Sequence, residues 1–346
     1  MLRFPLIVAV IFLHSYGTKL TFSEGAVGST ANSALSDFIR NLLSQGIGRT
    51  AVPLFFLMSG YLFFKDFAPS LQNYIKKLRS RFRTLLIPFL FWNITMLAFL
   101  GLTQSMPLTA QYFSGTKATV ADFSFIEGIN AVMGIGQMPI SYQMWFIRDL
   151  MVLVLLTPVI YFIDKYAGLP TLLALALAWY SGQFSSISRP LEATLFFFAG
   201  CHLVRRNLSL FSWDRYGPAI IGLYSVAAAV DALTFGTAVG NYVHKPAVVL
   251  GVMSALYLSK AAYRSTVVRE KLSYLAGASF FVYAAHEPLL TVFRKVAFKI
   301  FHPSSSFSVI ILYLAIPLLL IGFLLIIYST LSRHAPNALR VVNGGR

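Results

Sequence analysis

The sequence predicts an all-α polytopic membrane protein with about ten transmembrane helices and with both termini on the cytoplasmic side. Of its 346 residues, 57% are hydrophobic and only 12% are charged, which is about half the charged fraction of a soluble domain. The apolar residues form long segments, as in helices that cross lipid. The basic residues behind the net charge of +16 lie in short segments between them, which is typical of membrane orientation and does not favour nucleic-acid binding.

Ten apolar segments predict the membrane-spanning helices. Several are short for a hydrocarbon core of about 30 Å, so we expect tilt or local thinning of the bilayer. The predicted spans are residues 2–20, 47–65, 84–104, 142–163, 168–184, 190–204, 216–236, 244–260, 275–296 and 307–332. The apolar segment 121–135 is shorter and contains Glu127, so we predict an interfacial segment or a loop there. Residues 1–346 show no repeat and predict a single transmembrane domain.

The first segment has an alternative interpretation as a signal peptide, because Arg3 precedes a short apolar stretch. No clear small-x-small cleavage site follows at 15–17, so we interpret the segment as the first span. Placing the N-terminus inside puts 18 of the 28 Lys and Arg residues on the cytoplasmic side and nine outside, with Arg148 in a span. This excess supports the orientation with both termini inside.

The sequence predicts neither a metal site nor a disulfide bond. The one cysteine, Cys201, excludes an intramolecular disulfide and a cysteine-based zinc cluster. No His-Glu-x-x-His motif, phosphate-binding loop or Gly-x-Ser-x-Gly elbow is present. We predict no metal site.

Arg3 and His14 are the first candidate functional pair. They are eleven residues apart, which is about three helical turns and about 16 Å of rise, so they share one face of the helix. Arg3 then lies at the cytoplasmic edge and His14 near the middle of the membrane. A neutral imidazole there can act as a general base, or it can hydrogen-bond between helices in a structural role.

A basic cluster, Lys76 to Arg83, leads into the third predicted span. Lys76, Arg79, Arg81 and Arg83 can form a clamp for a phosphorylated cytoplasmic ligand, because guanidinium groups hold phosphate in a bidentate fork. The alternative is a cytoplasmic flank that orients the helix and contacts anionic lipids.

Two further spans carry polar side chains where they are costly. Trp145 and Arg148 lie in the fourth predicted span and can serve a polar cavity or anchor the helix at the interface. His286 lies about eleven residues into the ninth span, level with His14, so the two histidines suggest a shared cavity. Glu287 follows His286, and Pro288 disrupts the helix. We interpret the remaining histidines as interfacial: His202, His244, His302 and His334.

The order of these features resembles the acyltransferase 3 family of membrane-bound enzymes. Arg3 and His14 match its Arg-x10-His pattern, and the stretch Pro53 to Tyr61, which ends in Ser59-Gly60-Tyr61, resembles its second-span signature. The basic entry to the third span, Trp145-Phe146 and Tyr283-x-x-His286 are similar to further motifs of the family. Only Lys76-x-x-Arg79 approximates the Arg-x-x-Arg spacing that some members show before the third span.

This resemblance implies a bacterial inner-membrane enzyme that transfers an acyl group, commonly acetyl from acetyl-CoA, to a sugar hydroxyl. It implies that His14 is the base, that Arg3 supports it, and that the basic entry to the third span meets the CoA phosphates. The acceptor would be a carbohydrate or a lipid-linked glycan. We expect Ser59, Tyr61, Trp145, Arg148, His286 and Glu287 to line the substrate cavity, with Ser59 or a backbone amide as an oxyanion donor.

Two alternatives remain at this stage. A multi-span transporter or exporter of a glycan or small solute also places His, Arg and Glu inside the membrane. A purely structural subunit is the other, although it does not explain two histidines at matched depth. The sequence leaves the acceptor and the length of the acyl chain open.

Overall fold

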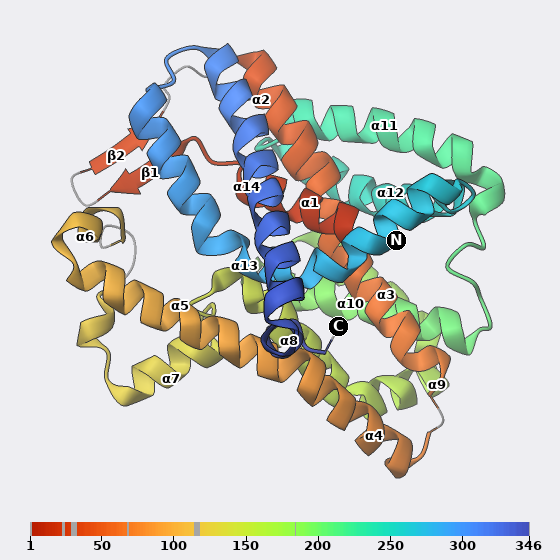
Figure 1. Ribbon diagram of the computed structural model, residues 1–346. Helices are drawn as coiled ribbons and strands as arrows, with labels where there is room; N and C mark the ends of the chain where they lie inside the picture. Colours follow the sequence, from red (N-terminus) through yellow and green to blue (C-terminus); the bar gives the residue numbers. More distant parts are fainter. Residues whose placement is uncertain are drawn as a thin grey trace. The chain divides into compact units, whose positions relative to one another are not determined.

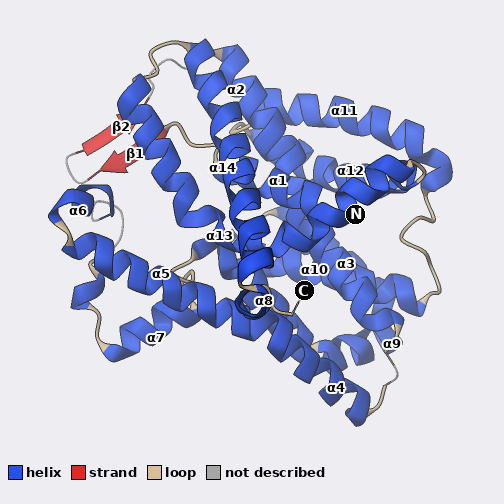
Figure 2. Cartoon of the chain, viewed as in Figure 1, coloured by secondary structure: helices blue, strands red, loops and turns tan. Residues whose placement is uncertain are grey.

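The structure is a computed structural model that describes residues 2–22, 25–28, 33–67, 69–113, 118–183 and 185–345 (Figure 1). The described residues are almost entirely helical (Figure 2). The exception is an antiparallel hairpin of β1 (Lys19–Phe22) and β2 (Gly25–Gly28). The prediction of an all-α chain is confirmed for the described residues apart from this one short hairpin. The helix α1 (Arg3–His14) also ends earlier than the predicted span 2–20, where Ser15, Gly17 and Thr18 replace the apolar run.

The chain folds into two compact units whose segments interleave along the sequence. The first unit comprises residues 1–10, 41–82 and 149–274. Its helices are α3 (Ala51–Lys65), α4 (Leu71–Arg81), α9 (Thr157–Ser181), α10 (Ser188–Arg205), α11 (Gly217–Thr234) and α12 (Ala238–Tyr263), with the π-helical η1 (Asn41–Ile47) and the 3-10 turns η2 (Gly48–Thr50), η6 (Ser185–Ile187) and η7 (Asp214–Tyr216).

The second unit comprises residues 11–40, 83–148 and 275–346. It contains α2 (Ala34–Arg40), α5 (Ile87–Ser105), α6 (Pro107–Phe113), α7 (Phe125–Met133), α14 (Ser306–His334) and α15 (Pro336–Val342), with η3 (Phe82–Leu86), η4 (Val120–Asp122) and η5 (Tyr142–Met144). Three helices begin in one unit and end in the other: α1, α8 (Trp145–Leu155) and α13 (Thr266–Phe301).

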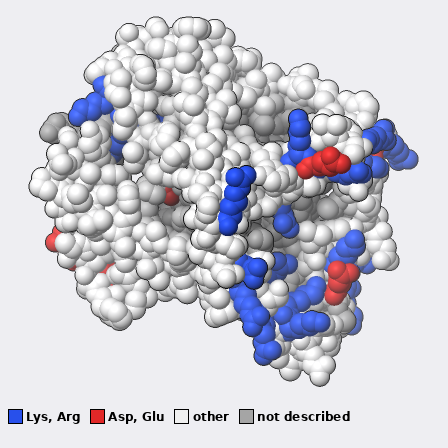
Figure 3. Space-filling view, in the orientation of Figure 1, with Lys and Arg blue, Asp and Glu red and all other residues white. Residues whose placement is uncertain are grey.

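Within the described residues, six helical segments are long and apolar enough to cross a membrane. They are Ala34–Lys65, Leu71–Ser105, Thr157–Ser181, Asp214–Thr234, Ala238–Tyr263 and Ser306–His334. The helix α1 is apolar but has only 12 residues. Most side chains on the face shown in Figure 3 are uncharged, and Lys and Arg outnumber Asp and Glu there. These features support a multi-pass membrane protein, whereas the count of ten spans and their orientation stay predictions.

The predicted fourth span, 142–163, is wrong as a single helix. The structure ends α8 at Leu155 and starts α9 at Thr157, since Pro158 lies in the first turn of α9 and favours a helix start there. The backbone is again non-helical at Ala167 inside α9, close to the loop predicted between the fourth and fifth spans.

The segment 121–135 contains the short helix α7, which Glu127 stabilises instead of interrupting. The Ser124 side chain accepts a hydrogen bond from the Glu127 backbone, and the Glu127 carboxylate accepts one from the Ser124 backbone. This capping box satisfies donors at the helix start. The same hydrogen bond from the Ser124 backbone N–H holds the pKa of Glu127 below its usual value.

Two glycines bring α3 and α10 into close contact in the first unit. A Cβ atom at Gly60 would lie 2.2 Å from the carbonyl oxygen of Phe197, and one at Gly200 would lie 2.4 Å from that of Leu57. Small residues allow such close backbone approach between membrane helices. The glycine of the Ser59-Gly60-Tyr61 stretch is therefore required for packing.

We predict that Gly60→Ala destabilises the protein. The added methyl group meets backbone atoms that cannot rotate away, and overpacking of this kind costs about 1–3 kcal/mol or more. The midpoint of thermal unfolding in detergent should fall by several degrees. Gly222→Ala is the control, because nothing lies within 4 Å of a Cβ atom there, and it should leave the midpoint unchanged or raise it. An unaltered midpoint for Gly60→Ala would contradict the close crossing.

Candidate functional site

His14 is the last residue of α1 and belongs to the second unit, as does Tyr142, which contacts its imidazole. The Nδ1 atom lies 3.1 Å from the hydroxyl of Tyr142 in η5. The two rings meet edge to face, with centroids 5.0 Å apart. His14 is half-buried, and these contacts hold its ring in one orientation.

Tyr142 links His14 to a carboxylate. Its hydroxyl donates to Oε1 of Glu287 at 3.0 Å. A hydroxyl has one proton to donate, so with an ionised Glu287 the Tyr142 oxygen accepts from Nδ1–H of His14. The lone pair of the imidazole is then on Nε2. This arrangement of imidazole, orienting hydroxyl and carboxylate resembles that of a catalytic triad.

Glu287 reaches this position because α13 is interrupted. The backbone at Glu287 is non-helical, with φ −106° and ψ 137°, immediately before Pro288. Its other carboxylate oxygen accepts a hydrogen bond of 2.8 Å from Thr291. Glu287 is only 5% exposed, and these two hydroxyl donors satisfy the buried carboxylate.

His286 lies beside His14, as the matched depth of the two residues suggests. The ring centroids are 5.3 Å apart, and His286 is fully buried. Its Nδ1 atom donates to the carbonyl of Tyr283 at 2.6 Å. Its Nε2 atom has no hydrogen-bond partner among the residues that the structure describes. A buried acceptor without a partner is costly, and a substrate hydroxyl is one group that would satisfy it.

A further set of hydrogen bonds fixes the segment that carries Tyr142. The backbone N–H of Ser141 donates to the side-chain oxygen of Asn93 on α5 at 3.1 Å, and Asn93 is fully buried. Gln143 donates to the carbonyl of Ala284 at 3.1 Å. The Tyr283 hydroxyl donates to the carbonyl of Gln143. The turn η5 is thus held to α5 and α13 on either side of Tyr142.

Arg148 and Trp145 lie near the start of α8 in the same unit. Arg148 donates to the carbonyl oxygens of Gly134 and Gln137, at 2.7 Å and 2.8 Å. These carbonyls follow the C-terminus of α7, where a cation is favourable. Trp145 is half-buried. Arg148 therefore holds a neighbouring loop, which is a structural role that the sequence did not indicate.

The other predicted site residues belong to the first unit, with one exception. Arg3, Lys76 and Arg79 are exposed, and Arg81 is partly buried and close enough to Arg3 for their charges to interact. Ser59 and Tyr61 are half-buried on α3. The exception is Arg83, an exposed residue of the second unit.

The interfacial interpretation of His202 and His244 missed the buried aspartates that both histidines contact. His202 is buried and its Nδ1 atom lies 2.6 Å from Asp164, which also forms an ion pair with Arg205 at 2.6 Å. His244 lies 2.9 Å from Asp231, which is 1% exposed. Each histidine pairs with an aspartate on another helix of the first unit, a contact that residue spacing along one helix does not reveal.

The sequence also missed Tyr142, Thr291 and Arg294. Arg294 donates to the carbonyl oxygens of His14 and Gly17, and the other two hydrogen-bond to Glu287. The contact of Thr291 with Glu287 could have been predicted, because Thr291 lies four residues after Glu287 and so one turn along the helix. Tyr142 gave none, because its role depends on a turn between helices.

This site defines a class of protein: a helical membrane protein with a hydrogen-bonded chain of His, Tyr and Glu at the end of its first helix. The described part of the chain has no cluster of three or more metal-ligating side chains. A family model for the acyltransferase domain matches residues 1–332, so the chain belongs to this acyltransferase family. It is 26% identical over 363 aligned positions to the succinoglycan biosynthesis protein ExoH of Rhizobium meliloti (strain 1021), covering all of this chain and 91% of that protein. No solved structure matches it.

We predict that Tyr142→Phe lowers the rate of acyl transfer. The variant keeps the ring and its packing but loses both hydrogen bonds, so the imidazole is no longer held in the tautomer that leaves Nε2 as the base. The kcat should fall about 10²–10⁴-fold, as for loss of a general-base arrangement, with little change in KM. Tyr274→Phe is the control, because Tyr274 is 72% exposed on α13. If the Tyr142→Phe enzyme keeps the wild-type kcat, the hydrogen-bonded chain from His14 through Tyr142 to Glu287 has no role in catalysis.

Proposed function

We propose that the chain is an acyl-CoA-dependent O-acyltransferase that transfers an acyl group, acetyl in the simplest case, to a hydroxyl of a glycan or lipid-linked glycan. His14 is the general base. The observation that carries this proposal is the hydrogen-bonded chain from His14 through Tyr142 to Glu287. Membership of the acyltransferase family supports the reaction class.

The reaction follows from the tautomer of His14. Its Nε2 atom removes the proton from the acceptor hydroxyl as that oxygen attacks the carbonyl carbon of the thioester. Ionised Glu287 stabilises the imidazolium that forms, acting through Tyr142. The tetrahedral intermediate then collapses, the carbon–sulfur bond breaks, and the imidazolium returns the proton to the CoA thiolate. The products are the ester and free CoA.

Donors to the developing oxyanion are also part of the proposal. Ser59 or a backbone amide supplies one hydrogen bond, and such a donor is worth about 2.7–4 kcal/mol of transition-state stabilisation. In a variant of the mechanism His14 is itself acylated and then passes the acyl group to the acceptor. That route separates the arrival of the donor from the arrival of the acceptor.

The CoA end of the donor is assigned to the basic entry of the third span. Lys76, Arg79, Arg81 and Arg83 supply cations for its phosphates, and Arg3 supports the site at the start of α1. Lys76, Arg79 and Arg83 are exposed, as contact with a ligand from solution requires. With the N-terminus inside, this cluster faces the cytoplasm, where acyl-CoA is made.

The acceptor is proposed from the relative. ExoH is named for succinoglycan biosynthesis, which supports a surface polysaccharide or its precursor as the acceptor here. The unpartnered Nε2 of buried His286 is suited to accept a hydrogen bond from a second hydroxyl of a sugar. We place the protein in the bacterial inner membrane, with ten spans and both ends in the cytoplasm.

We predict that His14→Ala abolishes transfer. Purified protein in detergent is incubated with radiolabelled acetyl-CoA and a host glycolipid extract, and thiol release is read in parallel. Label should enter the extract with the wild type and not with the variant, because no base remains. Detergent also separates an enzyme from a transporter, since a transporter needs a sealed membrane. Full activity of His14→Ala would refute both the general-base and the acyl-histidine mechanisms.

We predict that the triple variant Arg79→Gln, Arg81→Gln, Arg83→Gln raises the KM for acetyl-CoA at least about tenfold and changes kcat less. Phosphate contacts far from the reacting carbonyl contribute mainly to ground-state binding. Arg264→Gln is the matched control, because Arg264 is also basic, exposed and predicted to lie inside. An unchanged KM would show that the cluster only orients the helix.

A further inference from the structure

The terminal segment, residues 336–345, comprises α15 and the turn that follows it, and it is bound to two helices of the second unit. The indole N–H of Trp92 on α5 donates to the carbonyl of Val342 at 3.1 Å. The Asn343 amide donates to the carbonyl of Gly277 on α13 at 3.2 Å, and Asn343 is fully buried. The segment therefore has a fixed position against α5 and α13 (Figure 1).

A glycine allows the terminal segment to approach the start of α5 closely. Gly344 has a φ of 69°, and a Cβ atom there would lie 2.6 Å from the carbonyl oxygen of Thr84. Glycine adopts this conformation without strain and leaves room for that carbonyl. Thr84 directly follows Arg83, and the backbone N–H of Gly345 donates to the carbonyl of Arg340 at 2.7 Å. Docking of the segment thus brings Arg340 to the region of Arg83.

These two arginines are available to bind an anion. Both are exposed, and neither forms an ion pair within the described residues. The segments 83–92, 275–286 and 333–346 contain no Asp or Glu, so they contribute cations and no anion to this end of the unit. Phosphate suits unpaired guanidinium groups, because its charge and its bidentate geometry both match.

The terminal segment contacts the same two helices that carry residues of the candidate site. Its contact at Thr84 lies nine residues before Asn93, and its contact at Gly277 lies nine residues before His286. Nine helical residues rise about 13.5 Å, so the segment lies at a similar depth from both of these residues, which surround His14. In the predicted orientation this end of the two helices is cytoplasmic.

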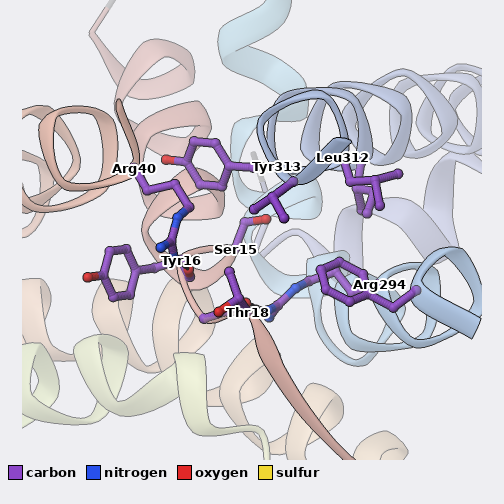
Figure 4. Close-up of a pocket in the computed structure, with 11 residues that line it drawn as sticks. Ser15, Tyr16, Thr18, Arg40, Arg294, Leu312 and Tyr313 are labelled. Carbon is purple, nitrogen blue, oxygen red and sulfur yellow. Dashed lines mark hydrogen bonds between the residues drawn. The ribbon is translucent and has the colours of Figure 1, made fainter. Parts of the chain in front are cut away.

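The opposite side of His14 does not admit a large donor. The cleft beyond the end of α1 is lined by residues 15–18, Arg40 and Arg294, among others (Figure 4). Its volume is about 10 Å³, close to that needed for one water molecule. CoA carries its thioester at the end of a long pantetheine arm, which is far larger than this space. We therefore expect the donor from the cytoplasmic side, where the terminal segment lies.

We propose that Arg340, which the terminal segment holds near Arg83, binds a phosphate of the acyl-CoA donor. The inference rests on the proposed function, and it adds a residue beyond the region that the family model matches, 1–332. The phosphates bind before the start of α5, and the pantetheine arm carries the thioester toward His14. An anionic lipid headgroup has the same phosphate chemistry, and the experiment distinguishes the two sources.

The experiment compares two acyl donors that differ in their phosphates. S-acetylpantetheine has the thioester and the arm of acetyl-CoA but no phosphate. We measure kcat and KM for each donor in detergent, with the glycolipid extract as acceptor. Arg340→Gln should raise the KM for acetyl-CoA about fivefold, which corresponds to a surface ion pair at the upper end of the usual range. It should leave kcat, and the KM for S-acetylpantetheine, at the wild-type values.

Three results would overturn the phosphate contact. An equal effect of Arg340→Gln on both donors shows a structural role, and no effect on either donor shows no role. The third result is a lipid contact: added phosphatidylglycerol stabilises the wild type more than Arg340→Gln, while the KM for acetyl-CoA is the same in both. Lys299→Gln is the control for loss of a charge, because Lys299 is exposed at the other end of α13, and its KM values should match the wild type.

Gly344→Ala tests whether docking of the terminal segment positions Arg340. The added methyl group meets the Thr84 carbonyl and displaces the segment, so the KM for acetyl-CoA should rise as in Arg340→Gln. Gly345→Ala is the matched control, because Gly345 also has a positive φ, 75°, but nothing lies within 4 Å of a Cβ atom there. Its KM should stay closer to the wild-type value. Equal KM values for the two alanine variants would contradict positioning by the docked segment.

A binding measurement separates failure of this inference from failure of the proposed function. Stabilisation against thermal unfolding by CoA alone is measured for the wild type, His14→Ala and Arg340→Gln. CoA should stabilise the first two equally, and Arg340→Gln should need about fivefold more CoA for the same stabilisation. An unchanged CoA dependence in Arg340→Gln overturns this inference alone. Failure of CoA to stabilise the wild type overturns the proposed donor as well.

Discussion

The hydrogen bond between Tyr142 and Glu287 is the constraint on which the rest of the site depends. A carboxylate that is 5% exposed is stable only when its lone pairs are satisfied. Tyr142 and Thr291 provide this, and Tyr142 then has no second proton to donate. The tautomer of His14 follows from that shortage. The chemistry of one imidazole is thus set by the burial of an acid on another helix.

The need to hold Tyr142 in place explains why so many buried polar groups surround the short turn η5. Asn93 accepts from the backbone before Tyr142, and Gln143 and Tyr283 bond the backbone around it. Each hydrogen bond satisfies a polar group that would otherwise be costly in an apolar environment. Together these bonds hold the backbone on both sides of Tyr142. A network of this kind is stable when complete and expensive when one member is removed.

Much of the helical framework could be predicted from the sequence, because long apolar segments have few alternatives in a membrane. The proximity of His14 and His286 could also be predicted, because the rise per residue of a helix gives the depth of each histidine in the membrane. The role of Tyr142 could not be predicted, because Tyr142 lies in a turn whose direction is set by hydrogen bonds to helices that are distant in the sequence. The pairs His202–Asp164 and His244–Asp231 were missed for a similar reason: sequence separation does not report which helices touch.

The polar residues near the end of α1, taken together, favour an enzyme over a transporter. A transport pathway needs groups that exchange partners as the site opens to each side, whereas the Glu287 carboxylate is committed to two hydroxyl donors and the Arg294 guanidinium to two backbone carbonyls. Groups held this firmly do not rearrange at low cost. They are suited to a reaction in which a fixed base must meet a carbonyl in one geometry. Nε2 of His286, beside His14, has no hydrogen-bond partner among the described residues and so keeps its capacity to accept a hydrogen bond from a ligand.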